Sequence, residues 1–435
     1  MNPESKAIFL HTGYRTAGTW LWSCFRSLDQ VTAYYEPLHE MLASIDRDML
    51  NTSTASSWRS GHPDLESPYF AEFAHLLDGE KRGIAGYEAV FSVDSFSGDA
   101  PEAAPRIVEY LNTLTRTANA AGRTPVFKFC RSLGRLNWFY DTFPDAVHIV
   151  VLKNPVTQWQ SCWELFARHR NAHFVAIPFA VLDMNRHVPL ARKVIEALRV
   201  TLPEMPESGT RVTLEARLTF WKQYVAQIDP ADAYRGFLAH WLLTLRHAFT
   251  SSDAVFDCDL AARSPAYAQA AEQWIAEMSG LNPSLGSVES ADGPRQCGFD
   301  AMRGLAIHLD ALALSKALVE SREISDETHS FWSSKLAQAT QVLAFGPDVN
   351  WPQGAVSLHR STRVVNIALI DGIAADAALV SELAATRSAL ERAKEQVKAL
   401  KRAPLRRLGT KVRKLFAPKP RRSETYIKKW RSRGN

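Results

Sequence analysis

A short apolar segment that leads directly into a glycine-bounded turn is the feature that most restricts the fold of this chain. Residues 7–12 (Ala-Ile-Phe-Leu-His-Thr) have the pattern of a buried strand, Gly13 to Gly18 form a turn, and Thr19–Leu28 is helical in pattern. In a strand–turn–helix unit, the N–H groups of the turn and first helical turn point at one spot, where the helix dipole favours negative charge. The segment therefore predicts an anion site.

Strand-like and helical segments continue to alternate along the chain. Residues 125–130 and 146–152 are short, apolar and rich in β-formers, and helical patterns occupy 134–142 and 158–169. Further segments are expected downstream: helix at 214–249, strand at 254–260, helix at 265–281, a Gly/Pro/Ser-rich loop at 282–300 and helix at 301–345. This order predicts an α/β fold, a P-loop-NTPase-like parallel sheet flanked by helices on both faces, with a helical C-terminal extension.

The same patterns divide the chain into four regions. An α/β domain at 1–300 is followed by a helical extension at 301–370, a heptad segment at 375–403 and a basic amphipathic tail at 404–435. The heptad positions are Leu379, Leu383, Thr386, Leu390, Ala393, Val397 and Leu400. They fit either a short coiled coil, which would pair two chains in a homodimer, or a single solvated helix.

Charge is divided unevenly between the body and the tail. From Lys398 to Asn435 there are fifteen Lys and Arg residues and one acid, so this segment carries +14 and residues 1–397 carry −9. Residues 405–416 place apolar side chains on one helical face and basic ones on the rest, which is typical of a helix on an anionic membrane surface. A disordered solubilising tail is the alternative. The acidic body and the few tail aromatics argue against a nucleic-acid partner.

Composition restricts the class of protein further. No run approaches the roughly 18 apolar residues of a membrane span, and the N-terminus lacks the pattern of a signal peptide. The five cysteines are scattered without paired spacing, which predicts reduced thiols, and no cluster has the spacing of metal ligands, so no metal is expected. These features predict a cytoplasmic protein, peripheral at the inner membrane face if the tail binds lipid.

The turn after the first strand has the two glycines of a phosphate loop but not its lysine. Thr19 stands where a nucleotide triphosphatase has Lys, and the cation of the turn is Arg15. The turn can hold phosphate, but the lysine and magnesium chemistry of an ATPase is not encoded. The predicted anion-binding residues are Gly13, Tyr14, Arg15, Thr16, Ala17, Gly18, Thr19 and Trp20.

The segment His11–Leu21 resembles the 5′-phosphosulfate loop of the sulfotransferases that use 3′-phosphoadenosine 5′-phosphosulfate (PAPS). A second element fits the same family, because Lys153-Asn-Pro ends an apolar strand and Ser161 stands eight positions after Lys153. In the family, an Arg and a Ser at these positions contact the 3′-phosphate, and Lys153 retains the charge without the bidentate fork of Arg. The resemblance covers residues 6–170 by motif and extends more loosely to residue 281.

The resemblance also implies a catalytic set. Sulfonate transfer needs a base for the attacking hydroxyl and cations for the leaving oxygen. Glu36, in a Glu-Pro pair, matches the base of the carbohydrate-directed and bacterial branch, and His39 is the alternative base. Lys128, at the carboxyl end of a strand, would either stabilise the leaving oxygen or hold the acceptor, and Arg15 is the competing candidate for the first role. Arg131 is expected in a solvent-facing ion pair.

These observations lead to one predicted function and two alternatives. The chain is predicted to be an enzyme that moves a sulfonate group from PAPS to a hydroxyl of a carbohydrate or glycolipid acceptor by in-line displacement. A P-loop-like kinase or nucleotide hydrolase is one alternative, and an inactive sulfotransferase-like docking module is the other.

Overall fold

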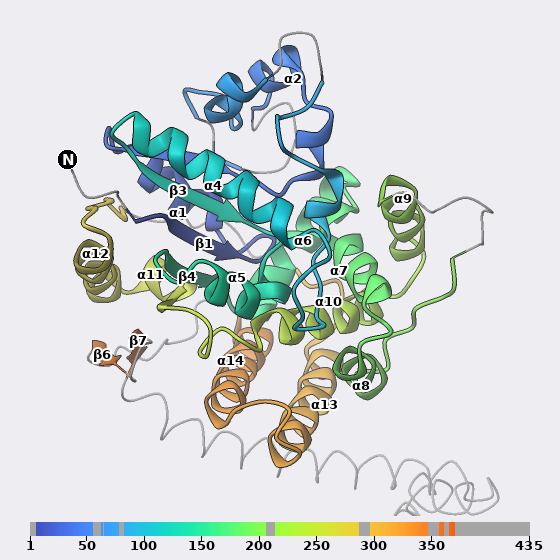
Figure 1. Ribbon diagram of the computed structural model, residues 1–435. Helices are drawn as coiled ribbons and strands as arrows, with labels where there is room; N and C mark the ends of the chain where they lie inside the picture. Colours follow the sequence, from blue (N-terminus) through green and yellow to red (C-terminus); the bar gives the residue numbers. More distant parts are fainter. Residues whose placement is uncertain are drawn as a thin grey trace, which may run out of the picture. The chain divides into compact units, whose positions relative to one another are not determined.

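A mainly parallel β-sheet lies at the centre of the described residues (Figure 1). The computed structural model describes residues 6–54, 62–63, 65–77, 82–205, 214–286 and 296–346, and the backbone of 356–360 and 365–369. Five strands run parallel in the order β2-β3-β1-β4-β5. Their bounds are β1 Ile8–Thr12, β2 Val31–Tyr35, β3 Thr124–Phe129, β4 Val147–Leu152 and β5 Ala254–Asp257. The α/β class and the parallel sheet predicted from the sequence are therefore confirmed.

Two more strands extend this sheet beyond β5. β7 (Val365–Leu369) pairs with β5 in parallel and with β6 (Val356–Arg360) in antiparallel orientation. The prediction of helix through residue 370 is wrong for these two segments, in which Val356, Val365 and Ile367 have the branched side chains that favour strands. The predicted heptad segment and basic tail lie outside the described residues.

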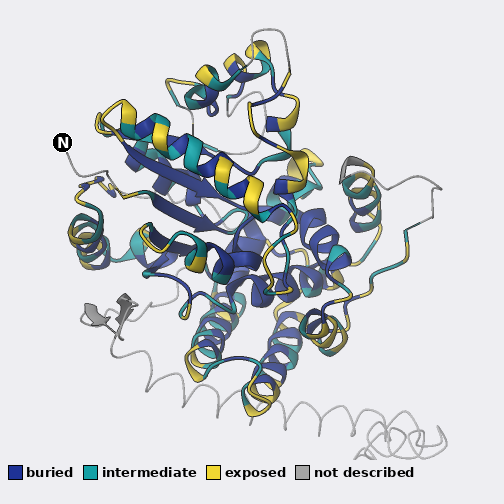
Figure 2. Ribbon diagram, viewed as in Figure 1, coloured by how far each residue is buried: buried dark blue, intermediate teal, exposed yellow. Residues whose placement is uncertain are grey.

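Helices cover both faces of the sheet. Neighbouring residues of a strand point to opposite faces. The Tyr34 hydroxyl donates to the carbonyl of Leu114 in one helix, whereas the Tyr35 ring packs on Trp22 of another, with centroids 5.0 Å apart. Figure 2 shows buried strands between helices that are exposed on their outer sides. The helices before β5 are α1 Gly18–Arg26, α2 Arg47–Asn51, α4 Ala104–Ala120, α5 Leu136–Thr142, α6 Pro155–His169, α7 His173–Met184, α8 Pro189–Ala197, α9 Leu214–Val225 and α10 Pro230–Leu245.

The segment expected to be one helix at 214–249 is two helices, α9 and α10. Pro230 begins α10, and the Asp229 side chain accepts a hydrogen bond from the N–H of Ala231 at 2.8 Å, which is a strong helix start. Strand β5 also ends earlier than expected. The Asp257 side chain caps the next helix by accepting from the N–H groups of Asp259 and Leu260. The helices after β5 are α11 Cys258–Arg263, α12 Pro265–Ser279, α13 Ala301–Glu320 and α14 Asp326–Phe345.

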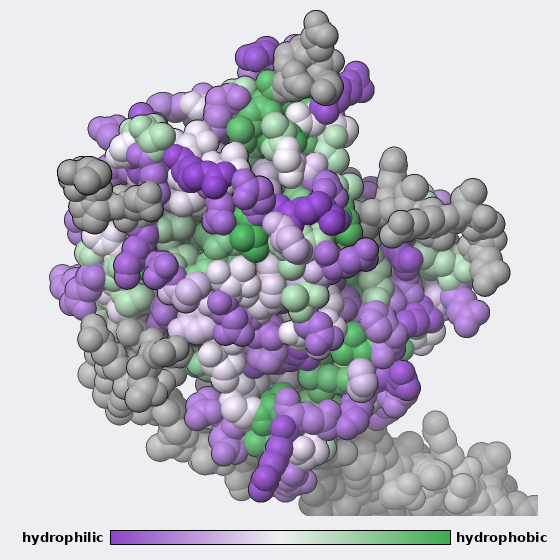
Figure 3. All heavy atoms as spheres, viewed as in Figure 1, coloured by the Kyte–Doolittle hydropathy of each residue, from purple (hydrophilic) through white to green (hydrophobic). Residues whose placement is uncertain are grey.

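The surface of the described chain is mainly polar. The face in Figure 3 is mostly hydrophilic, with apolar atoms in separate patches. Large apolar side chains that are exposed in the described ranges are Val90, Met302 and Phe345. None of the helices in those ranges has the length and apolarity needed to cross a membrane.

Candidate functional site

The turn between β1 and α1 has the backbone of an anion cradle. Arg15 and Ala17 both adopt the left-handed conformation, with φ of 64°. Ala17 is the N-cap of α1, makes no side-chain cap, and is followed by a first turn without acidic residues. Left-handed residues within such a turn direct successive N–H groups toward one concavity, and the helix dipole adds positive potential there. The local geometry therefore suits a bound anion.

Close packing between the turn and β1 explains the glycine at position 18. A Cβ atom on Gly18 would lie 2.5 Å from Cγ2 and 2.7 Å from Cβ of Thr12. The Thr12 hydroxyl in turn donates to the carbonyl of Phe129 at 2.9 Å, which joins β1 to β3 directly under the turn. The Thr16 hydroxyl donates to the carbonyl of Gly13 at 2.8 Å and closes the turn on itself. These contacts fix the shape of the cradle.

The structure brings the turn together with the second predicted element, on α6. Nε of Arg15 donates to Oγ of Ser161 at 3.0 Å, and the Arg15 guanidinium lies 5.4 Å from the ring centroid of Phe174. Nε2 of Gln158 donates to the carbonyl of Tyr14 at 2.6 Å, and its buried amide oxygen has no hydrogen-bond partner among the described residues. The turn and the first turns of α6 therefore form one polar surface.

Lys153 lies at the end of β4, at the entrance to α6. Its side chain is half-buried, and its ammonium has neither an acid nor a hydrogen-bond acceptor as partner within the described ranges. The next residue, Asn154, caps α6 by accepting from the N–H of Val156 at 2.9 Å. An unpaired, partly desolvated cation next to a helix N-terminus attracts anions. Lys153 and Ser161 thus lie where a second phosphate could bind.

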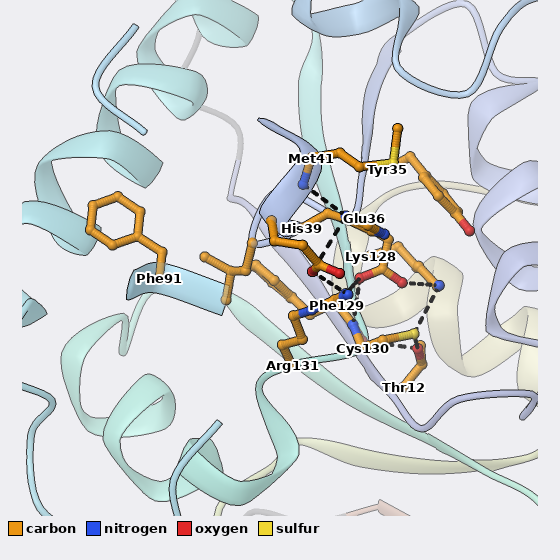
Figure 4. A network of polar contacts seen from close by, with 12 residues as sticks. Thr12, Tyr35, Glu36, His39, Met41, Phe91, Lys128, Phe129, Cys130 and Arg131 are labelled. Carbon is orange, nitrogen blue, oxygen red and sulfur yellow. Dashed lines mark hydrogen bonds and ion pairs between the residues drawn. The ribbon is translucent and has the colours of Figure 1, made fainter. Parts of the chain in front are cut away.

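Glu36 is the centre of a buried polar network at the carboxyl ends of β2 and β3 (Figure 4). Its carboxylate is paired with the ammonium of Lys128, and it accepts from the N–H of Cys130 at 2.9 Å and from Arg131 at 3.4 Å. Only 3% of Glu36 is exposed, and its backbone has the left-handed φ of 46°. That conformation turns the chain where β2 ends and directs the carboxylate at β3.

The charges of this network decide its protonation. Burial alone would raise the pKa of Glu36, but the cations Lys128 and Arg131 outweigh it and lower the pKa to about 2. Burial lowers the pKa of Lys128, yet Cys130 and Glu36 have the larger combined effect and raise it. The Cys130 thiol lies 3.0 Å from Nζ of Lys128, and burial raises its pKa to about 11. At neutral pH the pair is therefore ionised and the thiol is protonated.

The prediction that Arg131 forms a solvent-facing ion pair is wrong, because the residue is buried. Only 5% of it is exposed, and it bridges Glu36 and Glu40, with 2.6 Å between Nη2 and Oε2 of Glu40. The residue lies two positions after the end of β3, and carboxyl ends of parallel strands meet at one edge of the sheet. Its guanidinium is therefore turned into the site, where the carboxylates of Glu36 and Glu40 compensate its desolvation.

The alternative base, His39, is already engaged. Its Nδ1 accepts from the N–H of Met41 at 3.1 Å, and burial together with Arg131 lowers its pKa to about 4.

Sequence reasoning missed His62, whose Nε2 lies 3.4 Å from the Tyr35 hydroxyl. Burial, followed by the charges of Arg15 and Lys128, lowers the pKa of His62 to about 3. No spacing signal relates this histidine to the turn, so only the fold could identify it.

The remaining predicted residues support the turn from both sides. Thr19 is buried and hydrogen-bonds Tyr35. The ring of Trp20 is partly buried, 6.3 Å from that of Phe256, and therefore packs against the end of β5.

In the part of the chain that the structure describes, no group of three His, Cys, Asp or Glu residues could hold a metal ion. Comparison with protein-family models, curated proteins and solved structures gave no match.

Proposed function

We propose that this protein is a PAPS-dependent sulfotransferase that acts on a hydroxyl of a carbohydrate or glycolipid. The observation that carries the proposal is the contact between Arg15 and Ser161, because it joins the two elements that the sequence assigns to two phosphates. A site for a single phosphate would need only the turn after β1. A donor with a 5′-phosphosulfate and a 3′-phosphate needs the turn and also the segment that contains Lys153 and Ser161.

The residues present fit such a donor. The uncapped N-terminus of α1 and Arg15 would hold the 5′-phosphosulfate, and Lys153 with Ser161 would hold the 3′-phosphate. When bound, PAPS supplies an activated sulfonate that needs no metal to be transferred. Thr19, in place of the triphosphatase lysine, makes a kinase or nucleotide hydrolase the weaker proposal.

Glu36 and Lys128 have complementary roles in the proposed reaction. Glu36 is ionised and thus able to accept the proton of the acceptor hydroxyl, although its pKa of about 2 makes it a weak base in the free protein. Lys128 can share its charge with the leaving oxygen, and each loosening of the ion pair raises the proton affinity of Glu36. In-line attack then takes place between a carboxylate that gains a proton and an ammonium that stabilises the leaving group.

The acceptor class and location rest on the sequence. The Glu-Pro pair at Glu36 resembles that of the carbohydrate-directed branch, and the basic tail would keep a cytoplasmic enzyme at an anionic membrane surface where glycolipid acceptors reside. A homodimer formed through the heptad segment is compatible with this acceptor class and with this location.

Nucleotide binding and transfer test the proposal in two steps. Adenosine 3′,5′-bisphosphate should bind the purified full chain in calorimetry without magnesium, and sulfur-labelled PAPS should transfer its label to a panel of glycans. Glu36→Gln should keep nucleotide binding within about threefold and lose transfer, whereas the exposed control Glu102→Gln should keep both. Absence of nucleotide binding to the wild type would refute the proposal. Binding without transfer to any glycan would favour the inactive docking module.

A further inference from the structure

The polar network around Glu36 reaches the surface of the described chain through Arg131. Nη1 of Arg131 lies 3.4 Å from Oε2 of Glu36, and Nη2 lies 2.6 Å from Oε2 of Glu40. Two carboxylates therefore flank one planar guanidinium group. The exposed fraction of the side chain is 4% for Glu36, 6% for Arg131 and 25% for Glu40. The network is thus closed at Glu36 and open to an incoming molecule at Glu40.

Glu40 keeps an unoccupied hydrogen-bond acceptor at this opening. Its Oε2 pairs with Arg131, and within the described ranges no other residue donates to its Oε1. Burial would raise the pKa of Glu40, but the charge of Arg131 outweighs it and lowers the pKa to about 2. Glu40 is therefore ionised at neutral pH, and an ionised carboxylate can only accept hydrogen bonds.

His39 provides a hydrogen-bond donor beside that acceptor. Its Nδ1 accepts from the N–H of Met41 and lies 3.5 Å from Oε2 of Glu40, so the neutral ring carries its proton on Nε2 (Figure 4). In the part of the chain that is described, this Nε2–H has no hydrogen-bond partner, and 21% of the side chain is exposed. A sugar hydroxyl both donates and accepts, so hydroxyl groups match such a pair.

These two residues lie next to the predicted donor cradle. The Arg131 guanidinium lies 5.7 Å from the ring centroid of Tyr14. Tyr14 belongs to the turn after β1, where its carbonyl accepts from Gln158 of α6. A sugar bound at Glu40 would therefore be one guanidinium group away from Glu36 and from the turn that would hold the donor.

We propose that His39 and Glu40 form an acceptor subsite, which binds a second hydroxyl of the sugar beside the hydroxyl that Glu36 deprotonates. The inference rests on the proposed function, in which Glu36 is the base. It also restricts the acceptor class to neutral sugars. Lys128 and Arg131 are buried, so the exposed charge at this opening is the Glu40 carboxylate, which attracts hydroxyl donors and repels acidic groups.

Two conservative variants separate binding of the sugar from support of the fold. His39→Asn retains a side-chain oxygen for the N–H of Met41 and removes the Nε2–H donor. Glu40→Gln retains an oxygen for Arg131 and removes the charge. With the glycan that accepts sulfonate from PAPS, each variant should raise the KM for the glycan about tenfold and leave the KM for PAPS within about threefold. The exposed control His187→Asn should change neither.

Deoxygenated acceptors provide a readout that a purely structural role would not move. Among versions of that glycan that each lack one hydroxyl, one should be about tenfold poorer for the wild type and no poorer than the parent glycan for Glu40→Gln. Equal losses for the two proteins would overturn the proposal, as would a folded Glu40→Gln variant with the KM values of the wild type. If His39→Asn does not fold, Glu40→Gln alone decides.

Nitrogen NMR of the imidazole rings tests the subsite without PAPS and without transfer. Titration with methyl glucoside, methyl galactoside or methyl mannoside should shift the Nε2 signal of His39 saturably with at least one sugar, and methyl glucuronoside, which is acidic, should not. No shift with any of these neutral sugars overturns the proposal, and an equal shift with methyl glucuronoside overturns the neutral class. Absence of nucleotide binding refutes the proposed function, whereas this titration still decides the subsite. It also decides if neither variant folds.

Discussion

Nε of Arg15 donates a hydrogen bond to Oγ of Ser161 across 3.0 Å, although 146 positions separate the two residues. The contact makes the turn after β1 and the second turn of α6 neighbours on one polar surface. It also holds the guanidinium, a planar group of several N–H donors, beside the turn. The pair is therefore the most direct place to perturb the site.

Ser161→Ala should weaken the binding of adenosine 3′,5′-bisphosphate roughly tenfold. The variant removes one partner of a charged donor, which costs about 1.5–3 kcal/mol, together with the proposed phosphate contact. Calorimetric titration measures the change. Ser279→Ala is the matched control, because its hydroxyl donates to the carbonyl of Ile275 within α12 and makes no contact with the turn. Equal affinity of Ser161→Ala and wild type would contradict the assignment of Ser161.

Glu36→Gln should change how stability depends on pH. Because the pKa of Glu36 is lowered from 4.5 to about 2, its contribution is complete above pH 4.5 and is lost as the pH falls toward 2. The difference corresponds to about 3 kcal/mol. Chemical denaturation from pH 7 to pH 2.5 should show a less stable variant at pH 7 and a smaller acid loss than in the wild type. Parallel curves for the two proteins would show that Glu36 is not held as an ionised partner of Lys128.

Gly18→Ala should destabilise the protein by about 1–3 kcal/mol, since the new methyl group must displace the side chain of Thr12. Gly286→Ala provides the control, because a Cβ there meets no atom of the described residues within 4 Å. Urea denaturation compares the two variants with the wild type. A neutral Gly18→Ala would mean that the turn can move away from β1, and the cradle would then not be preformed.

The buried histidines His11 and His148 should both be neutral and carry their proton on Nε2. Nε2 of His148 donates to the carbonyl of Phe143 at 3.0 Å, so its Nδ1 accepts from Nε2 of His11, and Nδ1 of His11 accepts from Ser132 at 2.8 Å. Burial lowers the pKa of both rings. Their neutrality therefore stabilises the fold above about pH 6.5, and stability falls below that pH because the unfolded chain binds protons.

Nitrogen NMR of labelled imidazoles tests this arrangement. The ring nitrogens of His11 and His148, assigned with single His→Gln variants, should show the neutral Nε2–H form at pH 6. Cationic shifts for either ring at that pH would rule out the hydrogen-bonded chain from Ser132 to Phe143.

Local sequence accounts for much of the fold and for part of the site. Apolar runs identified β1, β3 and β4, because a strand buried on both faces is a short continuous apolar segment. The glycine spacing and Arg15 identified the turn, since that geometry depends on neighbouring residues. The burial of Arg131 could not be predicted in this way, because it depends on a residue far away in the sequence. Its surroundings in the sequence are those of a loop, and its burial depends on Glu40, which lies 91 positions away.

Two polar residues of the described chain were beyond the reach of sequence patterns. Lys335 looks like any lysine of a surface helix, and only the docking of α14 brings it to Asp257. His62 likewise carries no motif.

By itself, the sequence determined the strand–turn–helix unit at Gly13–Trp20 and the strand that ends at Lys153, because periodicity and glycine positions act over a few residues. The tertiary structure alone decided that Glu36 is held between Lys128 and Arg131 and that Lys153 is left without an acid partner in the described chain. Charge pairing depends on distances of a few ångströms between segments far apart in the chain, and only packing sets those distances.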